Sequence, residues 1–567
     1  MYLRTTKRKN KDGSVVEYYQ LAHNVRHAET GIPVAEIIHN FGRADELDRE
    51  ELVRLCRSIA RVCGLEVCDP LDPPSETVPK DESLSRLPED MKLIRTLQFG
   101  IPFVAEVLWE RLGIGPVLRK VMAESGGSDL HEKALLAMTA NRLSEPESKL
   151  GVWERWLETV FMPSCNPLKL YQMYEAMDLL HWNLSKVEDA VFFQTANLFN
   201  LVVDLIFFDT TTASFSIDEE DEDSEDAVGL RKYGHSKAGT WTSQIVVALA
   251  VTREGLPVRS WVFAGNTSDV ETVKRVREDL RGWKLGRALF VADSGMNSAS
   301  NREELAKACG KYLLATRAGS VSEIKEEVLT RPGRFKTIAE NLQAKEVIVG
   351  DGELRRRYIL CFNPKEAARE KAHREQVVKE LEAELEKHPA REATAKWAIE
   401  LLASGRYSRY VSIDKNKRIR IDRDAVRSAA KHDGKWVLQT NDDTLSIEDA
   451  ATGYKGLLVI ERCFRALKKT RIKIEPMHHF LAKRIEAHVK ICVFALLIER
   501  VCELKCRRPW PQIKRVLSTL QATEFHTPNF QFFQRNEPTA EVGRILKSIG
   551  ISLPKAILDL QSTPTEA

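Results

Sequence analysis

The sequence predicts a multidomain α/β protein whose central part is a mixed β-sheet. The chain has 567 residues, more than one ordinary core holds, so two or more domains are expected. After residue 201, apolar stretches follow one another in the order strand, hairpin, helix and strand. Residues 91–200 instead place apolar side chains at three- and four-residue steps, which is typical of helices. These observations indicate a sheet domain preceded by a helical domain.

The composition excludes several classes of protein. Hydrophobic residues make up 43% and charged residues 29%, with a formal net charge of only +3, so local basic patches matter more than total charge. No apolar stretch approaches the ~20 residues of a membrane helix, and no apolar segment follows the basic N-terminus as in a secretory signal. Ten cysteines without a CxxC pair indicate reduced thiols. A cytoplasmic protein without membrane partners is therefore expected.

The first 90 residues are predicted to form a small α/β module. Two strand-like stretches, "SVVEYYQLAHNVR" and "PVAEIIHNFG", precede a capped helix over 45–64. A linker rich in Pro, Ser and Asp follows over 69–83.

The sheet domain is predicted from four consecutive segments. A strand over 202–217 is followed by a hairpin over 243–265, a helix over 269–283 and a strand over 287–293. A right-handed strand–helix–strand crossover makes the first and last of these strands parallel neighbours. The acidic run "DEEDEDSED" within this part is interpreted as a solvated loop, with a nonspecific cation-binding loop as the alternative.

A charged helical stretch over 365–404 and a basic hairpin over 409–426 are predicted to interrupt the sheet, which resumes at "KWVLQTN".

Two aspartates stand where chemistry is expected. Asp209 lies inside an apolar strand, where an unpaired carboxylate is costly unless it is protonated, paired or bound to a metal. Asp293 ends the fourth strand. If the two strands are neighbours, the carboxylates converge and favour Mg²⁺ or Mn²⁺. Each aspartate alone could equally be a helix cap or turn former.

A third acidic residue, Glu461, lies on a helix that follows the resumed sheet. Tyr454, Leu457, Glu461 and Lys468 fall within a stripe about 60° wide at the edge of the helix's apolar face. Glu461 is therefore predicted to lean towards the sheet, although an ordinary amphipathic helix would show the same border of charge.

These residues resemble the three acidic residues of a bacterial insertion-sequence DDE transposase, with Asp209 in "FFDTTTASF", Asp293 in "VADSGMNS" and Glu461 in "YKGLLVIERCFRALK". The last motif is similar to the signature of the insertion-sequence-four group, which reads Tyr, two residues, Arg, three, Glu, six, Lys. Leu457 stands at the arginine position, so Lys455 or Arg465 would have to replace that phosphate contact. The segments "LRKYGHSKAG" and "AGNTSDVET" resemble the connections of this group, and the basic N-terminal module and "RCFRALK" resemble its sixteen-thirty-four-like subgroup.

The resemblance implies a ribonuclease-H-like catalytic domain, interrupted by an insertion, that cuts transposon ends and joins them to target DNA. It also implies a homodimer on paired ends. Three carboxylates holding two Mg²⁺ or Mn²⁺ ions would activate water or a 3′-hydroxyl and stabilise the leaving oxygen. The expected parts are an N-terminal module (1–90), a helical domain (91–200), the first catalytic part (201–318), the insertion (319–435), the second catalytic part (436–500) and a C-terminal region for dimerisation (501–567).

Contacts with DNA phosphates are expected from basic residues near the acidic ones. The basic cluster that follows Glu461 is favoured, and Lys468 is its strongest candidate for a phosphate contact. Tyr454 could contact DNA through its hydroxyl or pack at the start of its helix. Candidates for DNA binding are Tyr454, Arg465, Lys468, Lys469, Arg471, Lys237 and His235. His478 and His479 lack a third ligand at suitable spacing, so a zinc site is not expected.

Two other functions stay open. One is a DNA-binding protein that kept the fold and lost catalysis, which the leucine at position 457 keeps possible. The other is a general ribonuclease-H-like nuclease, which would leave the helical domain without a purpose.

Overall fold

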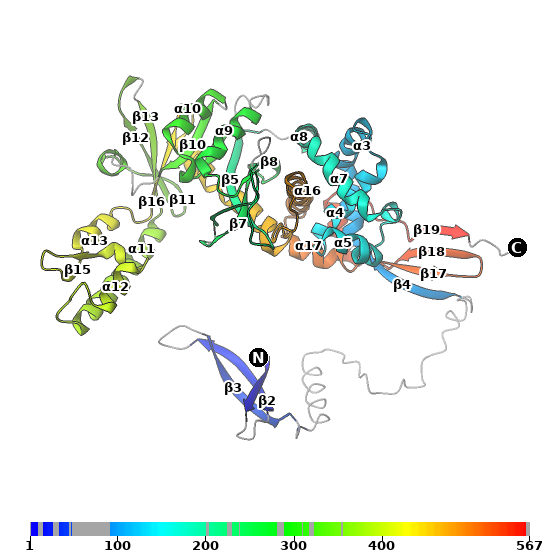
Figure 1. Ribbon diagram of the computed structural model, residues 1–567, viewed down its shortest axis with the longest axis horizontal. Coiled ribbons are helices and arrows are strands. Elements are labelled where there is room, and N and C mark those ends of the chain that lie inside the picture. Colours follow the sequence, from blue (N-terminus) through cyan, green and yellow to red (C-terminus); the bar gives the residue numbers. More distant parts are fainter. Residues whose placement is uncertain are drawn as a thin grey trace. The chain divides into compact units, whose positions relative to one another are not determined.

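The computed structural model describes residues 2–9, 15–26, 33–44, 47, 91–199, 203–223, 229–237, 239–280, 288–308, 310–316, 323–352 and 355–562. The chain divides into two compact units, Met1–Leu87 and Pro88–Ala567. Figure 1 shows the elements of each. No helix among the described residues is long and apolar enough to cross a membrane.

The first unit contains an antiparallel sheet in the order β1–β2–β3. Its strands are β1 (Tyr2–Lys9), β2 (Val15–Arg26) and β3 (Pro33–Arg43). β2 and β3 coincide with the two predicted strands. β1 was not predicted, because its Arg and Lys residues interrupt any alternation of apolar and polar side chains. Apart from residue 47, the predicted helix over 45–64 and the linker over 69–83 lie outside the described residues.

The second unit is built around a ten-stranded mixed sheet, as expected for a mixed α/β fold. The strand order is β11–β12–β13–β16–β10–β9–β5–β7–β6, with β8 beside β7. The strands are β5 (Leu205–Ser214), β6 (Lys232–His235), β7 (Trp241–Thr252), β8 (Pro257–Ala264), β9 (Leu289–Ala292), β10 (Lys311–Thr316), β11 (Lys336–Ala339), β12 (Leu342–Val349), β13 (Arg356–Phe362) and β16 (Lys435–Thr440). β5 and β9 are parallel neighbours, so the predicted crossover is confirmed, as is the β7–β8 hairpin.

Helices cover both faces of this sheet, which is the layered arrangement of a ribonuclease-H-like fold. One face of β5, with Phe208, packs with α9 (Asp269–Leu280) and α10 (Ala299–Ala308). The other face, with Phe207, packs with α14 (Ile447–Lys455) and α15 (Leu458–Arg465). Since side chains alternate along a strand, successive residues of β5 serve two different cores.

A helical layer precedes the sheet, as predicted, after the additional strand β4 (Lys92–Gln98). The helices are α2 (Gly100–Arg111), α3 (Ile114–Glu124), α4 (Asp129–Leu143), α5 (Lys149–Gly151), η2 (Val152–Trp156), α6 (Leu157–Thr159), η3 (Pro163–Cys165), α7 (Leu170–Trp182) and α8 (Leu184–Phe199). Helix α16 (Ala482–Cys506), from much later in the chain, contacts α4, α7 and β8. It is buried along most of its length, so it ties the helical layer to the sheet.

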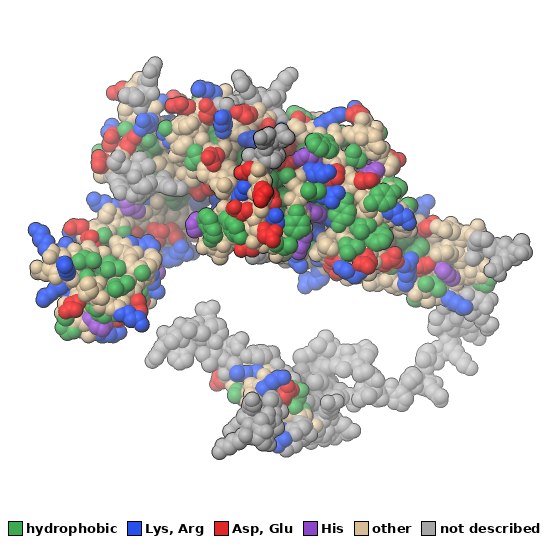
Figure 2. Space-filling model, in the orientation of Figure 1, with side chains coloured by type: hydrophobic (Ala, Val, Ile, Leu, Met, Phe, Trp, Pro, Cys, Tyr) green, Lys and Arg blue, Asp and Glu red, His purple; other side chains and the backbone are tan. Residues whose placement is uncertain are grey.

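The part of the chain that stands apart from the sheet is narrower than the predicted insertion over 319–435. η5 (Ile324–Val328) packs on the sheet, and β11, β12 and β13 extend it. The separate lobe has its own apolar core and consists of α11 (Pro364–Lys387), α12 (Lys396–Ala403), η7 (Ser408–Tyr410), β14 (Val411–Ile413), β15 (Ile419–Ile421) and α13 (Arg423–Ala430). The predicted charged helix and basic hairpin are both present in it. Figure 2 shows Lys and Arg side chains along the outer edge of this lobe.

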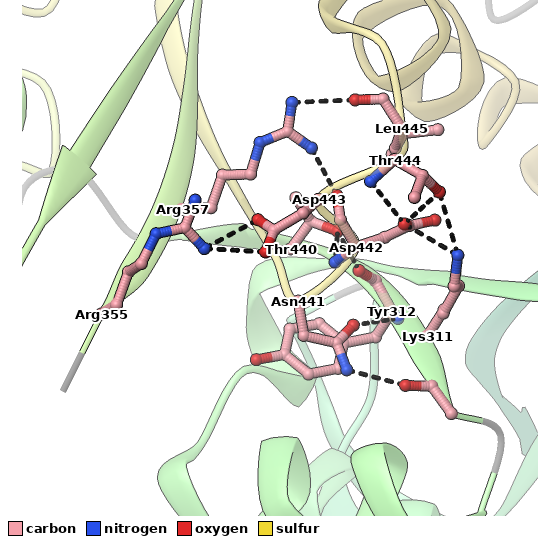
Figure 3. Close-up of polar contacts among 11 residues, drawn as sticks. Lys311, Tyr312, Arg355, Arg357, Thr440, Asn441, Asp442, Asp443, Thr444 and Leu445 are labelled. Carbon is pink, nitrogen blue, oxygen red and sulfur yellow. Dashed lines mark hydrogen bonds and ion pairs between the residues drawn. The ribbon is translucent and has the colours of Figure 1, made fainter. Parts of the chain in front are cut away.

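A polar network fixes the loop that leads from β16 into α14 (Figure 3). The side chain of Asp442 accepts from Lys311 Nζ at 2.8 Å, and Asn441 Oδ1 accepts from the backbone of Tyr312 at 2.8 Å. Arg357 donates to the carbonyl oxygens of Asp442 and Leu445. Because β10, β13 and the loop are joined at several points, the start of α14 has a fixed position over the sheet.

The end of the chain returns to the helical layer. Its elements are α17 (Trp510–Leu517), β17 (Gln521–His526), β18 (Phe530–Arg535), α18 (Ala540–Ser548) and β19 (Ile557–Ser562). β17 pairs with β4, which forms a second sheet in the order β19–β18–β17–β4. Residues 91–200 and 501–567, expected as separate parts, therefore share one sheet.

Candidate active site

Asp209 and Asp293 lie side by side in the middle of the central sheet. The parallel register pairs Phe208 of β5 with Ala292 of β9, so the two aspartates occupy the next position on adjacent strands. Both belong by alternation to the face of Phe207 and Val291, which α14 and α15 cover. Asp209 is half-buried in the sheet, whereas Asp293 is exposed at the end of its strand.

The predicted single helix that carries Tyr454 and Glu461 is broken into two. α14 ends at Lys455, and α15 begins at Leu458. A Cβ atom added to Gly456 would lie 2.4 Å from the Phe207 ring, so only glycine lets the helix junction come this close to β5. The two residues of the junction, Gly456 and Leu457, keep helical backbone angles, and Glu461 is exposed on α15.

Leu457, at the position where the transposase signature has arginine, is buried with 8% of its surface exposed. It packs in the apolar core between the helices and the sheet. The side chain at this position is therefore not available at the surface of this chain. Lys455 and Arg465, the two replacements considered from the sequence, are both exposed.

The Tyr454 hydroxyl connects the acidic residues. It donates to Asp293 Oδ1 at 3.3 Å. Burial raises the pKa of Tyr454 well above its usual value, and the charges of Asp293, Glu461 and Asp209 raise it further. All three predicted carboxylates thus lie within electrostatic reach of one hydroxyl group.

The electrostatic environment of Asp209 is unusual for an aspartate. Burial raises the pKa of its carboxyl to about 6, and the charges of Asp269 and Asp293 add to this rise. The backbone N–H of Thr210, which donates to Asp209 Oδ1 at 2.7 Å, and the charge of Lys237 partly oppose it. A pKa moved towards neutrality by burial and by neighbouring carboxylates is typical of a functional site.

Asp269, a fourth acidic residue at this site, was not among the sequence-predicted residues. It opens α9 on the opposite face of the sheet, where its Oδ1 accepts from the hydroxyl of Thr210. Its Oδ2 accepts from Lys237 Nζ at 2.9 Å and lies 3.1 Å from the position of a Cβ on Gly295. The available signal was the segment "AGNTSDVET", which resembled a transposase connection but contained no residue with an assigned role.

The chemistry of these side chains fits a divalent cation only in part. Asp209 and Asp293 offer adjacent carboxylate oxygens, the donors that Mg²⁺ and Mn²⁺ prefer, and the pKa of Asp209 is raised by burial first and by the neighbouring carboxylates second. Across the described residues, however, no three His, Cys, Asp or Glu side chains are close enough to bind one metal ion together. Glu461 does not complete a three-carboxylate set in this arrangement.

The predicted DNA-binding residues occupy different environments. The ammonium of Lys237 donates to Asp269 Oδ2 at the site. The backbone N–H of Lys237 donates to Thr212 Oγ1 of β5 at 3.1 Å. His235 is exposed and packs edge to face on Trp241. Lys468 lies where η8 (Ala466–Thr470) departs from helical geometry. The side chain of Lys469 lies outside the described residues.

Arg465 and Arg471 help to line a basic cavity of about 500 Å³ next to the Glu461 helix, which we call the arginine groove. The groove is formed by Arg462, Arg465, Arg471, Arg500, Arg507 and Arg508, with Glu503. Arg471 is held by the carboxylates of Glu499 and Glu503 at 2.8 and 2.9 Å, which gives it a structural role. Arg465 has no carboxylate partner among the described residues.

The described part of the acidic run is occupied by protein contacts. Asp221 pairs with Arg231 at 2.9 Å, and Asp223 pairs with Lys232 at 2.9 Å. These ion pairs attach the run to β6 and its approach, which favours the interpretation as a loop over a cation-binding site. Residues 224–228 lie outside the described residues.

Comparison with protein-family models gives two matches. Residues 3–69 match the model described as IS1634 family transposase, N-terminal domain. Residues 204–498 match the model described as transposase DDE domain, and this match covers more than half of the chain. It contains Asp209, Asp293 and Glu461. A search of curated proteins finds no match.

Proposed function

The chain belongs to the IS1634 family of DDE transposases, and on this premise we propose that it cuts DNA at the terminal inverted repeats of its own element and joins the ends to target DNA. The observation that carries this proposal is the placement of Asp209 and Asp293 on adjacent parallel strands. The Tyr454 hydroxyl bonds to Asp293 and is also within electrostatic reach of Glu461.

Asp209 and Asp293 would hold divalent ions, Mg²⁺ or Mn²⁺ and two in number, and Glu461 would complete the set by moving closer to them than it lies in this arrangement. Ions bound by these carboxylates would supply an activated water or 3′-hydroxyl and stabilisation of the leaving oxygen. The protein's own contribution is rigid placement. Asp209 and Asp293 are fixed by the sheet register, whereas Glu461 sits on a short helix held close to β5 by Gly456.

Lys237 and Tyr454 are proposed to orient the acidic residues as well as the substrate. Lys237 opposes the rise in the pKa of Asp209 and so favours the ionised carboxylate that a cation needs. Tyr454 holds Asp293 by a hydrogen bond. The side chains of His235, Lys468 and Lys469 remain candidates for DNA phosphates on the grounds of charge and position in the sequence.

We propose that the DNA backbone binds along the arginine groove. Arg462, Arg465 and Arg507 line it, and none of the three has a carboxylate partner in the described part of the chain. Because phosphate contacts displace counterions, this groove would give strong, salt-dependent affinity without reading sequence. We also propose a homodimer on paired ends, by analogy with transposases of this kind.

The test uses a plasmid that carries the genomic DNA flanking this gene, and therefore both ends of the element. The wild-type protein with Mg²⁺ is expected to release the element, and Asp209→Asn and Asp293→Asn are expected to bind the plasmid without cutting it. Asp204→Asn is the matched control, since Asp204 is an exposed aspartate paired with Arg253.

Each alternative gives a different result in this assay. Binding without cleavage by the wild-type protein, with any divalent metal, would identify a DNA-binding protein that has lost catalysis. Equal cleavage of a plasmid without the flanking DNA would identify a general nuclease.

A further inference from the structure

A second basic cavity, which we call the buried cation pocket, lies beside the end of β5, where Glu475 bonds to Ser214. Its volume is about 390 Å³, within the range of small-ligand sites. It is lined by the end of α4, the approach to α5, residues 473–481 and the start of α16. The side chains that matter for its chemistry are Arg142, Lys149, Lys473, His488, Glu147 and Glu475.

Arg142 and Lys149 place two cations in the buried wall of this pocket. Their side chains belong to residues that are only 5% and 4% exposed. Neither has a carboxylate partner among the residues that the structure describes. Arg142 donates to the carbonyl oxygens of Ile472, Lys473 and Glu147, and its Nε has no hydrogen-bond partner. Buried cations without an anion are costly, so such a pair requires an explanation.

The nearby imidazole does not neutralise these cations. Lys149 Nζ lies 3.0 Å from His488 Nδ1. Burial and the neighbouring charge of Lys149 hold the pKa of His488 well below its usual value, so the ring is neutral and its Nδ1 accepts a hydrogen bond from Lys149 Nζ. Burial, together with the charge of Arg142, lowers the pKa of Lys149 to about 7. An anion in the pocket would restore the charged form of Lys149.

The two carboxylates of the pocket are already engaged elsewhere. Glu147 pairs with Arg155 at 2.7 Å. Glu475 accepts from the backbone N–H of Ser214 at 3.1 Å. Lys473, exposed at the rim, adds a further positive charge. Glu475 keeps its negative charge, but Arg142, Lys149 and Lys473 outnumber it, so the natural complement of the pocket is a compact anion.

We propose that the buried cation pocket binds a phosphate group of the DNA backbone, an inference that rests on the proposed function. Two buried cationic donors and one rim lysine match the several oxygens of a phosphate diester. Glu475 bonds to Ser214, five positions beyond Asp209 on β5, which at about 3.3 Å per residue is roughly 17 Å.

The experiment measures binding of a labelled 30-base-pair duplex of arbitrary sequence by the full chain in EDTA, over a series of salt concentrations. Lys149→Met keeps the length of the buried side chain and removes its charge. Lys473→Asn removes the rim charge and suits the left-handed backbone of this residue, whose φ is 54°. Each variant is expected to bind about tenfold more weakly and to lower the slope of log Kd against log salt by about 0.9.

Arg391→Asn is the control, because it removes one positive charge at another exposed residue with a left-handed backbone, in the separate lobe. It should leave affinity and slope unchanged. Unchanged DNA binding in both pocket variants, with wild-type circular dichroism, would overturn the proposal. If inorganic phosphate raised the Tm of the wild type but not of Lys149→Met while DNA binding stayed the same, the ligand would be a free phosphate compound and the DNA assignment would fail. Cleavage is measured separately, so a protein that binds through this pocket without cutting would contradict only the proposed function.

Discussion

Replacing Asp209 with asparagine should stabilise the metal-free protein while it abolishes cleavage. The carboxyl has a pKa of about 6 in the fold against an ordinary value of 3.8. Between these values the folded chain binds more protons than the unfolded chain, so stability is highest below the unfolded pKa and falls as pH rises through 6. The difference corresponds to about 3 kcal/mol at pH 7.5, and asparagine avoids this loss.

The effect is measurable as a shift in Tm. For a cooperative unit of about 480 residues, an unfolding entropy of about 2.1 cal/mol/K per residue makes 3 kcal/mol equal to about 3 °C. Differential scanning calorimetry in EDTA should show Asp209→Asn melting higher than the wild type at pH 7.5, with the difference vanishing near pH 4. Mg²⁺ should then raise the Tm of the wild type only.

The control for this measurement is Asp204→Asn, which removes an exposed, ion-paired aspartate just before the same strand and should bring no stabilisation. The reasoning would be refuted if Asp209→Asn melted no higher than the wild type at pH 7.5 and if the Tm difference between the two proteins were the same at pH 4. Such a result would mean that the ionised Asp209 carboxylate does not lower the stability of the fold.

Three further substitutions test the surroundings of the site. Lys237→Met should move the acidic limb of the pH–rate profile of cleavage upwards, since Lys237 lowers the pKa of Asp209, and an unmoved limb would exclude this role. Gly456→Val should lower the free energy of unfolding by about 1–3 kcal/mol in urea titrations and reduce cleavage, because its side chain overlaps the Phe207 ring, and wild-type stability would contradict the close approach. Leu457→Arg completes the transposase signature but buries an unpaired cation, so it should cost about 3 kcal/mol of stability rather than strengthen DNA binding, and tighter binding at unchanged Tm would show the opposite.

The central strands of the fold could be predicted because their signals are local. The apolar run of β5 and the strand–helix–strand order were sufficient to place β5 beside β9. That adjacency in turn places Asp209 next to Asp293, since parallel strands in register bring equivalent positions together. The sequence therefore contained the two-aspartate half of the site.

The remaining half depends on contacts that no local pattern encodes. Gly456 looks like an ordinary residue within a helical stretch, yet its backbone lies so close to Phe207 that a Cβ atom would overlap the ring. Leu457 resembles a lost arginine, whereas it fills a core. Asp269 resembles a helix cap, and its bond to Lys237 joins segments 32 positions apart. Such roles follow only from tertiary packing.

β5 connects all these features through its two faces and its far end. Asp209 points to the side of α14 and α15, while Thr210 bonds to Asp269 on the other side. Further along, Ser214 donates to Glu475 at the buried cation pocket. A shift of register by one residue would exchange the faces of Asp209 and Thr210 and remove the carboxylate from the site. Because β5 is paired along its length within a ten-stranded sheet, the position of Ser214, and with it the Glu475 wall of the pocket, is fixed relative to Asp209 by the protein.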